Sequence, residues 1–211
     1  MSDQPTCRIV VLASGAGSNL AALLDAHTDA HWGGQIVAVG SDVPECGALR
    51  LARAAGVPDF ALRVRDFPQR AQWDVALASA VAKYEPDLIV SAGFMRILGD
   101  AFLAQWEGKI INTHPALLPA FPGANPVRDT LAYGVKVTGV TVHLVDRGVD
   151  TGPIIAQRVV EVQDGATQDE LHERIKTIER QLLVEVVGSM ARDGWRAQGR
   201  YVNLNSPVSV E

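Results

Sequence analysis

The sequence predicts an α/β protein built on one mostly parallel, twisted sheet with helices on both faces. The segment Ile9-Val10-Val11-Leu12 is continuously apolar, which is typical of a strand covered on both faces. A glycine-rich loop and a helical pattern follow it, and short apolar runs then alternate with helical patterns as far as Asn112. This alternation favours parallel strands joined by helices, with a Rossmann-like N-terminal half.

Length and composition fit one ordinary globular domain, 1–211. Of the 211 residues, 47% are hydrophobic and 20% are charged, so a core of useful size is available. The net charge of −5 gives no general surface for nucleic acid or an acidic membrane, although one local site can still bind phosphate. Two cysteines are too few for a disulfide framework, and the polar residues 1–6 lack a signal-peptide pattern. We expect a reduced, cytoplasmic protein without a nucleic-acid or membrane partner.

Apolar runs and helical spacing place the individual elements. They predict strands at 8–13, 36–40, 59–64, 87–92, 109–112, 136–144 and 154–162, and helices from 20 onward and at 46–55, 69–84, 102–106 and 126–133. The strand at 136–144 alternates only in part, which leaves an antiparallel direction open. Thr167 and Glu170 form a capping-box pattern for a last helix that reaches about residue 190. The polar tail, 191–211, receives no assignment.

The loop at residues 14–19 predicts an anion site. It joins the first strand to a helix start, where backbone N–H groups can approach a phosphate closely. We therefore expect Gly17→Val to impair phosphate binding far more than folding. A dinucleotide-binding turn is the alternative, with Asp42 as its ribose-binding acid, but that pattern needs a third glycine where this chain has Leu20. A plain glycine turn also stays open.

The stretch after Ile110-Ile111 carries the strongest candidates for catalysis. Asn112 and His114 lie two residues apart, so in an extended strand their side chains leave the same face. Three prolines in residues 115–122 restrict the following loop, which suits a preformed site. Asp150 lies in a later glycine-flanked loop that can fold over the same crevice. The alternative is a strand that ends in a proline-rich turn, with both side chains bonded to loop carbonyls.

A metal site and covalent catalysis find little support. His114, His143 and Asp150 could approach one ion, but their spacings match no standard ligand motif, and we interpret His143 as an ordinary strand residue. Neither Cys7 nor Cys46 lies in a nucleophile motif. We expect no metal.

Four motifs, taken together, give the chain a specific resemblance. They are Ala13-Ser14-Gly15-Ala16-Gly17-Ser18-Asn19-Leu20, Ala92-Gly93-Phe94-Met95-Arg96-Ile97-Leu98, Asn112-Thr113-His114-Pro115-Ala116-Leu117-Leu118-Pro119 and Asp150-Thr151-Gly152-Pro153. In order and spacing they resemble the folate-dependent phosphoribosylglycinamide formyltransferases. The third and fourth motifs are specific to folate-type formyltransferases, and the glycine loop and the length favour the glycinamide ribonucleotide branch.

The resemblance implies a formyltransferase fold and a role for each motif. Catalysis would fall to Asn112, His114 and Asp150, and the ribonucleotide would bind at Gly15, Ala16, Gly17, Ser18, Asn19 and Glu179. The co-substrate 10-formyltetrahydrofolate would lie against Arg70, Met95, Arg96, Ile97, Leu98, Val145 and Asp146. The N-terminal half, about 7–105, would then bind phosphate, and the C-terminal half, about 106–190, would bind folate and carry catalysis. Residue spacing alone predicts a solvated Arg70. It fits residues 93–98 equally well as the wall of a pocket or as part of the core.

The sequence departs from the family at one position. Relatives commonly place a histidine soon after the Phe-Pro-Gly turn, where this chain has Asn125. An asparagine cannot titrate, so any proton-shuttling role at this position is in doubt here.

The expected reaction is formyl transfer to the amine of 5-phosphoribosylglycinamide in purine biosynthesis. Rivals are a formyltetrahydrofolate hydrolase, which usually carries an N-terminal regulatory domain, and methionyl-tRNA formyltransferase, which carries a further C-terminal domain. A non-catalytic nucleotide-binding module is a rival of another class, but it leaves Asn112, His114 and Asp150 unexplained. The resemblance leaves a homodimer open.

Overall fold

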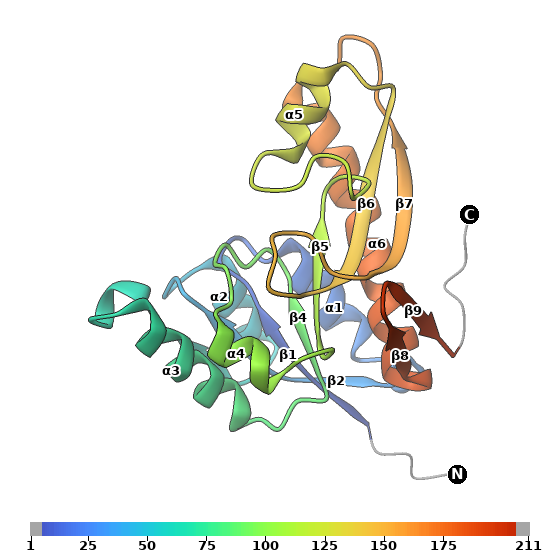
Figure 1. Ribbon diagram of the computed structural model, residues 1–211. Helices are drawn as coiled ribbons and strands as arrows, with labels where there is room; N and C mark the ends of the chain where they lie inside the picture. Colours follow the sequence, from blue (N-terminus) through green and yellow to red (C-terminus); the bar gives the residue numbers. More distant parts are fainter. Residues whose placement is uncertain (1–5, 206–211) are drawn as a thin grey trace.

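A seven-stranded sheet forms the centre of the computed structural model, which describes residues 6–205 (Figure 1). The strands are β1 (Cys7–Leu12), β2 (Gly34–Ser41), β3 (Asp59–Ala61), β4 (Leu88–Ser91), β5 (Ile110–His114), β6 (Val137–Leu144) and β7 (Ile154–Glu161). Their order is β3-β2-β1-β4-β5-β6-β7, parallel from β3 to β5 and antiparallel from β5 to β7. The predicted mostly parallel sheet is confirmed, and β6 runs antiparallel.

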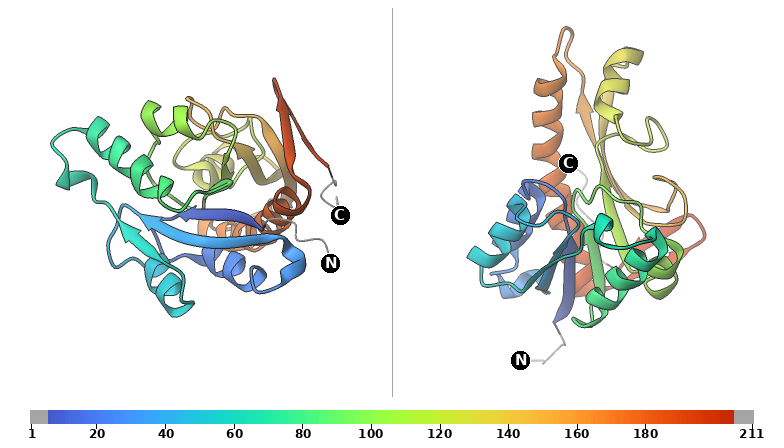
Figure 2. Two further views of the ribbon diagram at one scale, coloured as in Figure 1. Left: turned by 90° about the horizontal axis from the view of Figure 1, so that it is seen from below. Right: turned by 90° about the vertical axis from the view of Figure 1, so that its left-hand side faces the viewer.

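Helices cover both faces of this sheet, as predicted (Figure 2). They are α1 (Ser18–Ala26), α2 (Gly47–Ala54), α3 (Arg70–Ala82), α4 (Asp100–Gln105), α5 (Pro126–Tyr133) and α6 (Gln168–Asp193). Successive residues of β1 point to opposite faces, so Ile9 and Val11 pack with α1, α2 and α6, whereas Val10 and Leu12 pack with α3 and α4. The continuous apolar run of β1 is thus explained by two cores, one on each face.

The core on the α3 face contains the largest buried side chain. Trp73 has no exposed surface, and its Nε1 donates to the Leu62 carbonyl at 2.7 Å. Burial of such a ring typically contributes about 3 kcal/mol or more, and the hydrogen bond avoids an unsatisfied buried donor. This packing holds α3 and its N-terminal Arg70 beside the sheet.

Strand order reverses direction at β1. The chain passes from β1 outward to β2 and β3 and then returns to β4 on the other side of β1. Open α/β sheets bind ligands beyond the carboxyl ends of the strands at such a point. Here the loops after β1 and β4 meet, with Ser14 N–H donating to the Gly93 carbonyl at 3.1 Å.

The third strand is shorter than predicted, and the tail, which received no assignment, contains regular structure. The third strand ends at Ala61, not at residue 64, because the chain turns into a 3₁₀ turn at Val64–Asp66. The tail contains a hairpin of β8 (Trp195–Gln198) and β9 (Tyr201–Leu204) after α6. The capping box of Thr167 and Glu170 is confirmed at the start of α6. Residues 1–5 at the predicted polar start and 206–211 in the predicted tail lie outside the described range.

No helix in the described range is both long and apolar enough to cross a bilayer.

Candidate active site

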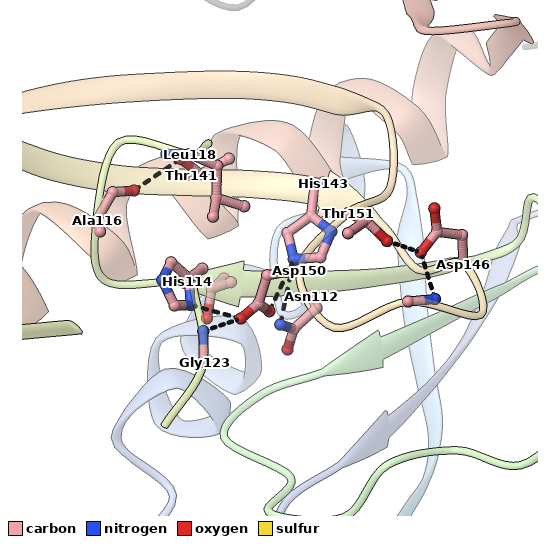
Figure 3. A network of polar contacts seen from close by, with 12 residues as sticks. Asn112, His114, Ala116, Leu118, Gly123, Thr141, His143, Asp146, Asp150 and Thr151 are labelled. Atoms are coloured by element: carbon pink, nitrogen blue, oxygen red, sulfur yellow. Dashed lines mark hydrogen bonds and ion pairs between the residues drawn. The ribbon is translucent and has the colours of Figure 1, made fainter. Parts of the chain in front are cut away.

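The candidate catalytic residues gather where β5 ends against the antiparallel part of the sheet (Figure 3). Thr113 donates to Glu179 on α6 and therefore faces that helix. Asn112 and His114, on either side of it, leave the opposite face of β5. The loop after β6 brings Asp150 to this face, so the three predicted residues come together.

The ring of His114 lies between two oxygen atoms. Its Nδ1 is 3.3 Å from Oδ2 of Asp150, and its Nε2 is 2.8 Å from the carbonyl oxygen of Phe121. Both neighbours only accept hydrogen bonds, so each ring nitrogen faces an acceptor. His114 is 3% exposed, which leaves these two groups as the main influences on its ring orientation.

Asp150 is held in place by its backbone and by a second hydrogen bond. Its Oδ2 also accepts the Gly123 N–H at 2.8 Å. Asp150 and Phe121 both have positive φ, 55° and 52°, which costs about 1–2 kcal/mol for residues other than glycine. Both unusual conformations therefore occur in the two loops that close around His114.

The proline-rich loop is fixed by side chains of β6 and β7. Thr141 Oγ1 donates to the Ala116 carbonyl at 2.7 Å and accepts the Leu118 N–H at 3.0 Å. Gln157 Nε2 donates to the Leu118 carbonyl at 2.9 Å. These bonds support the expectation of a preformed site.

His143 lies on strand β6, as predicted, and its side chain also belongs to this cluster. It pairs with Asn112 across β5 and β6, and Nε2 lies 3.3 Å from Nδ2 of Asn112 and 3.7 Å from Oδ1 of Asp150. Burial lowers the pKa of His143 below its usual value, against the opposing effects of the Leu144 carbonyl and Asp150. A neutral ring that donates from Nδ1 to the Leu144 carbonyl leaves Nε2 as an acceptor.

This acceptor orients the Asn112 amide. Because Nε2 of His143 needs a donor, the amide nitrogen of Asn112 faces it and uses one N–H there. The second N–H of Asn112 remains available to the crevice. The cluster thus presents one oriented neutral donor beside a histidine–carboxylate pair.

The glycine loop adopts a geometry that requires glycine at residue 17. Gly17 has φ +87°, and a Cβ there would lie 2.8 Å from Cα of Ala48 on α2. The expectation that Gly17→Val spares the fold was wrong, because the loop packs directly on a helix backbone. Gly15 has open space at the Cβ position. The effect of a Gly15 substitution on ligand binding can therefore be measured without a change in the packing of the protein.

Two buried polar side chains lie near the β1 and β5 ends. Asn19 in the first turn of α1 is 8% exposed, and its Oδ1 has no hydrogen-bond partner within residues 6–205. Glu179 is 9% exposed and accepts from Thr113. An unpaired buried acceptor costs about 1–3 kcal/mol, so Asn19 is ready for a donor from a ligand.

Asp42 connects the glycine loop with the 93–98 loop. Its Oδ1 accepts from Ser14 Oγ at 2.5 Å, and its Oδ2 accepts from Arg96 Nε at 2.6 Å. Ser14 Oγ in turn accepts the Met95 N–H at 2.8 Å. Both oxygens of Asp42 are thus engaged and its side chain is 1% exposed, which argues against a ribose-binding role in a dinucleotide site.

The predicted folate-side residues divide into exposed and buried groups. Met95 and Ile97 are 77% and 69% exposed, whereas Leu98 is buried with the α3 and α4 core. Arg70 donates to the Ile97 carbonyl and lies 4.1 Å above the Trp73 ring. Arg70 thus contacts the 93–98 loop, whereas residue spacing alone had predicted a solvated arginine.

The loop that carries Asp150 is stabilised from within. Val145 donates its N–H to the Ile110 carbonyl at 2.9 Å, which extends the pairing of β5 and β6. Asp146 accepts from Gly148 N–H at 3.0 Å and Thr151 Oγ1 at 2.6 Å. Both residues therefore shape the turn that presents Asp150.

Neither cysteine belongs to this cluster, because both lie in the hydrophobic core. Burial, with a smaller effect of Asp87, raises the pKa of Cys7 to about 11, so this thiol is a poor nucleophile. Within residues 6–205 no group of three or more His, Cys, Asp or Glu side chains is arranged to hold a metal ion.

Comparison with protein families shows which family the chain belongs to. Residues 7–187 match the formyl transferase family.

The chain belongs to the formyl transferase family.

Individual formyl transferases agree with this assignment over most of their length. Phosphoribosylglycinamide formyltransferase of Mycobacterium tuberculosis is 55% identical over 203 residues, which is 96% of this chain and 94% of that protein. The Bacillus subtilis enzyme of the same name is 38% identical over 85% of this chain and 92% of its own length. The crystal structure of glycinamide ribonucleotide transformylase 1 from Symbiobacterium toebii has a TM-score of 0.93 and 39% identity, with 96% of each chain covered. The predicted family and fold are both confirmed.

The position that departs from the common formyl transferase pattern lies at a helix start. Asn125 is exposed and is the N-cap of α5, yet its side chain makes no cap hydrogen bond. The Asn125 amide therefore does not cap α5. The first helical residue is Pro126, which has no backbone N–H and so needs no hydrogen-bond partner there.

Proposed function

We propose that this formyl transferase moves the formyl group of 10-formyltetrahydrofolate to the amine of 5-phosphoribosylglycinamide in de novo purine biosynthesis. The observation that carries the proposal is the cluster of Asn112, His114 and Asp150 at the carboxyl end of β5, in a chain that shares 55% of its residues with a phosphoribosylglycinamide formyltransferase. We further propose a cytoplasmic location and no nucleic-acid or membrane partner. A homodimer and the division into a phosphate-binding and a catalytic half stay predictions.

Asn112 is suited to stabilise the charge that develops on the formyl oxygen. Attack by the amine turns the formyl carbon tetrahedral and places negative charge on its oxygen. A preoriented donor at that point is typically worth a factor of about 10²–10³ in rate. The N–H of Asn112 that is not used by His143 is such a donor.

His114 and Asp150 are suited to act as one unit. Asp150 fixes the orientation of the His114 ring through its 3.3 Å contact with Nδ1. In the present conformation both ring nitrogens are engaged, so His114 acts on the formyl oxygen only when the Phe121 contact is exchanged for the ligand. The reaction removes a proton from the attacking amine and delivers one to the departing folate nitrogen, and Asp150 can relay it directly or through water.

The substrate's phosphate is proposed to bind at residues 15–19. The backbone of this loop precedes the N-terminus of α1, where N–H groups and the helix dipole favour an anion. Asn19 offers its unpaired Oδ1 to a donor, such as a hydroxyl or amine of the ribonucleotide. Glu179, buried behind Thr113, is proposed to face the same substrate through the oxygen not bonded to Thr113.

The folate is proposed to lie against the 93–98 loop and the Val145–Asp146 turn. Met95 and Ile97 expose apolar surface that suits a flat ring system. Arg70 and Arg96 supply cations for the carboxylates at the other end of a folate. Leu98 would contribute through the backbone, because its side chain packs in the core.

One incubation separates this proposal from its rivals. The protein is mixed with 10-formyltetrahydrofolate, with and without 5-phosphoribosylglycinamide, and both products are followed by mass spectrometry. Formylglycinamide ribonucleotide that forms only with the amine supports the proposal. Deformylation by water at the same rate in both mixtures identifies a hydrolase, and no reaction in either identifies a binding module.

A further inference from the structure

A pocket opens beside the 93–98 loop, and none of its lining residues belongs to the cluster of Asn112, His114 and Asp150. Its volume is about 510 Å³, and it is lined by Asp42, Val43, Pro44, Arg63, Val64, Arg65 and Arg96. We call it the arginine pocket. Arg63 and Arg65 come from the segment after β3, and Arg96 comes from the loop after β4.

The charges in the arginine pocket do not balance. Three guanidinium groups line it, whereas its one carboxylate, Asp42, already binds Ser14 and Arg96 through both oxygens. Within the described residues neither Arg63 nor Arg65 has an ion-pair partner. The chain as a whole carries a net charge of −5, so this excess of positive charge is local.

A fourth arginine adds to the same positive region. Arg70 reaches the Ile97 carbonyl next to Arg96. Its pKa is lowered, mainly by loss of solvent and also by the nearby charge of Arg96, while Asp74 and Asp42 act in the opposite direction. Adjacent cations are unfavourable unless water, salt or a bound anion screens them.

We propose that the arginine pocket binds the carboxylates of γ-linked glutamates added to the end of the folate. This inference rests on the proposed function, because it needs the folate to lie along the 93–98 loop with its first glutamate near Arg96. Each added glutamate brings one carboxylate, and the planar guanidinium fork binds carboxylates in a bidentate manner. Arg63 and Arg65 line the same pocket as Arg96, so they are within reach of a tail that continues from it.

The surface of the pocket suits a flexible, hydrated chain. Arg65 is exposed and Arg63 is half-buried, so the arginines lie at an open rim where carboxylates can pair without losing all their water. Val43, Pro44 and Val64 offer only small apolar contacts for the methylene groups between the carboxylates. A free phosphate has the same charge complementarity, and the experiment must distinguish the two sources.

The test compares folates that differ only in tail length. KM for 10-formyltetrahydrofolate is measured with one glutamate and with five, in the wild type and in the Arg63→Ala/Arg65→Ala double variant. In the wild type, KM for the long-tail folate is expected to be on the order of tenfold lower than KM for the short-tail folate, because two exposed ion pairs together contribute about that much. The double variant is expected to raise the long-tail KM toward the short-tail value and to leave the short-tail KM unchanged. Lys83→Ala/Arg196→Ala removes equal charge from exposed positions on other elements and should keep the tenfold preference.

Salt and charge reversal sharpen the comparison. The long-tail preference should shrink as NaCl is raised, because exposed pairs are screened. Arg63→Glu/Arg65→Glu should reverse the preference, so that the long tail binds more weakly than the short one.

Several outcomes would overturn the inference. Equal KM values for both tails in the wild type, or a preference that survives in Arg63→Ala/Arg65→Ala, would exclude the pocket as the tail site. Inorganic phosphate that abolishes the long-tail preference at millimolar concentration, while the double variant loses phosphate binding by calorimetry, would identify a phosphate pocket instead. Failure of the proposed function is a different result, namely no formyl transfer from the short-tail folate. Calorimetry of both folates without the amine then still measures the tail contribution.

Discussion

Nδ2 of Asn112 lies 3.3 Å from Nε2 of His143, across a directly opposed pair of residues on β5 and β6. The oxygen and nitrogen of a carboxamide can exchange places by rotation, and this contact explains why the nitrogen of Asn112 is the end that serves as donor in the crevice. His143 accepts one N–H of the amide because its other nitrogen already donates to the Leu144 carbonyl at 2.9 Å. We infer that His143 is a positioning residue for Asn112.

His143→Leu should therefore lower kcat while leaving both KM values nearly unchanged. The variant removes one hydrogen bond worth about 1 kcal/mol, which corresponds to roughly a fivefold to tenfold loss. His143→Gln keeps an acceptor near Asn112 and should restore part of the rate. A purely structural role predicts instead that both variants lose stability and that the remaining folded enzyme turns over normally.

The lowered pKa of His143 also predicts how stability depends on pH. Because the folded ring binds its proton less tightly than the unfolded ring, the unfolded chain binds more protons below its pKa of about 6.5. Stability from this group is present above that value and is lost as pH falls toward the folded pKa. The slope is at most about 1.4 kcal/mol per pH unit.

Urea unfolding between pH 7.5 and 5.5 measures this effect. His143→Gln should show a smaller decrease in unfolding free energy than the wild type over this range. Asp150, His114 and Asp146 also face His143, so the difference between the two proteins matters and not the absolute slope. Identical slopes would mean that His143 titrates alike in the folded and unfolded chains.

The sequence predicted the parts of the site that depend on local geometry. Alternation along β5 was enough to put Asn112 and His114 on one face, and the sequence also predicted a loop and helix start after β1. The role of His143 depends on strand register, which a local pattern does not contain, because a slip of one residue reverses every side chain. The resemblance pointed to Arg70, but its contacts with Ile97 and Trp73 depend on how α3 packs, which the spacing does not contain.

The C-terminal hairpin was not predicted because its strands are short and only partly buried. Both are four residues long and mostly exposed. They are held by tertiary contacts, such as the bond from Trp195 Nε1 to the Gly108 carbonyl at 2.9 Å. Val202 and Leu204 alternate on one side of β9 and pack against the core, but two such positions are too few to identify a strand in the sequence.

The two glycines of the phosphate loop should respond differently to alanine. Gly17→Ala combines a φ of +87° with a contact of 2.8 Å to Ala48 and should cost about 1–2 kcal/mol of stability. Gly15→Ala meets no atom within 4 Å, so it should unfold like the wild type. If phosphate lies against this loop, Gly15→Ala should still raise the ribonucleotide KM, by roughly tenfold for one lost close contact. Thermal unfolding and KM measured on both variants test this, and an unchanged KM in Gly15→Ala would place the phosphate elsewhere.

The hairpin tip should influence the loop that carries Asp150. Arg200, between β8 and β9, donates to the Thr151 carbonyl at 2.5 Å, one residue beyond Asp150. Arg200→Ala should loosen this loop and lower kcat by roughly twofold to tenfold, the effect of one exposed hydrogen bond. Arg196→Ala, an exposed arginine on the same hairpin, is the matched control. Equal rates for the two variants would show that the hairpin does not position Asp150.

Asp150 should be essential for turnover but not for binding. Asp150→Asn keeps the size of the side chain and its acceptor for the Gly123 N–H, but it removes the charge beside His114. General acid–base assistance is typically worth about 10²–10⁴-fold, so kcat should fall within or beyond this range while both ligands still bind. Because His114 and Asp150 form one pair, adding His114→Ala should cost much less than the product of the two single losses.

Kinetics of the three variants, with affinities measured by calorimetry, provide the comparison. Multiplicative losses would show that the 3.3 Å contact has no catalytic consequence, and near-normal turnover in Asp150→Asn would remove this carboxylate from the mechanism.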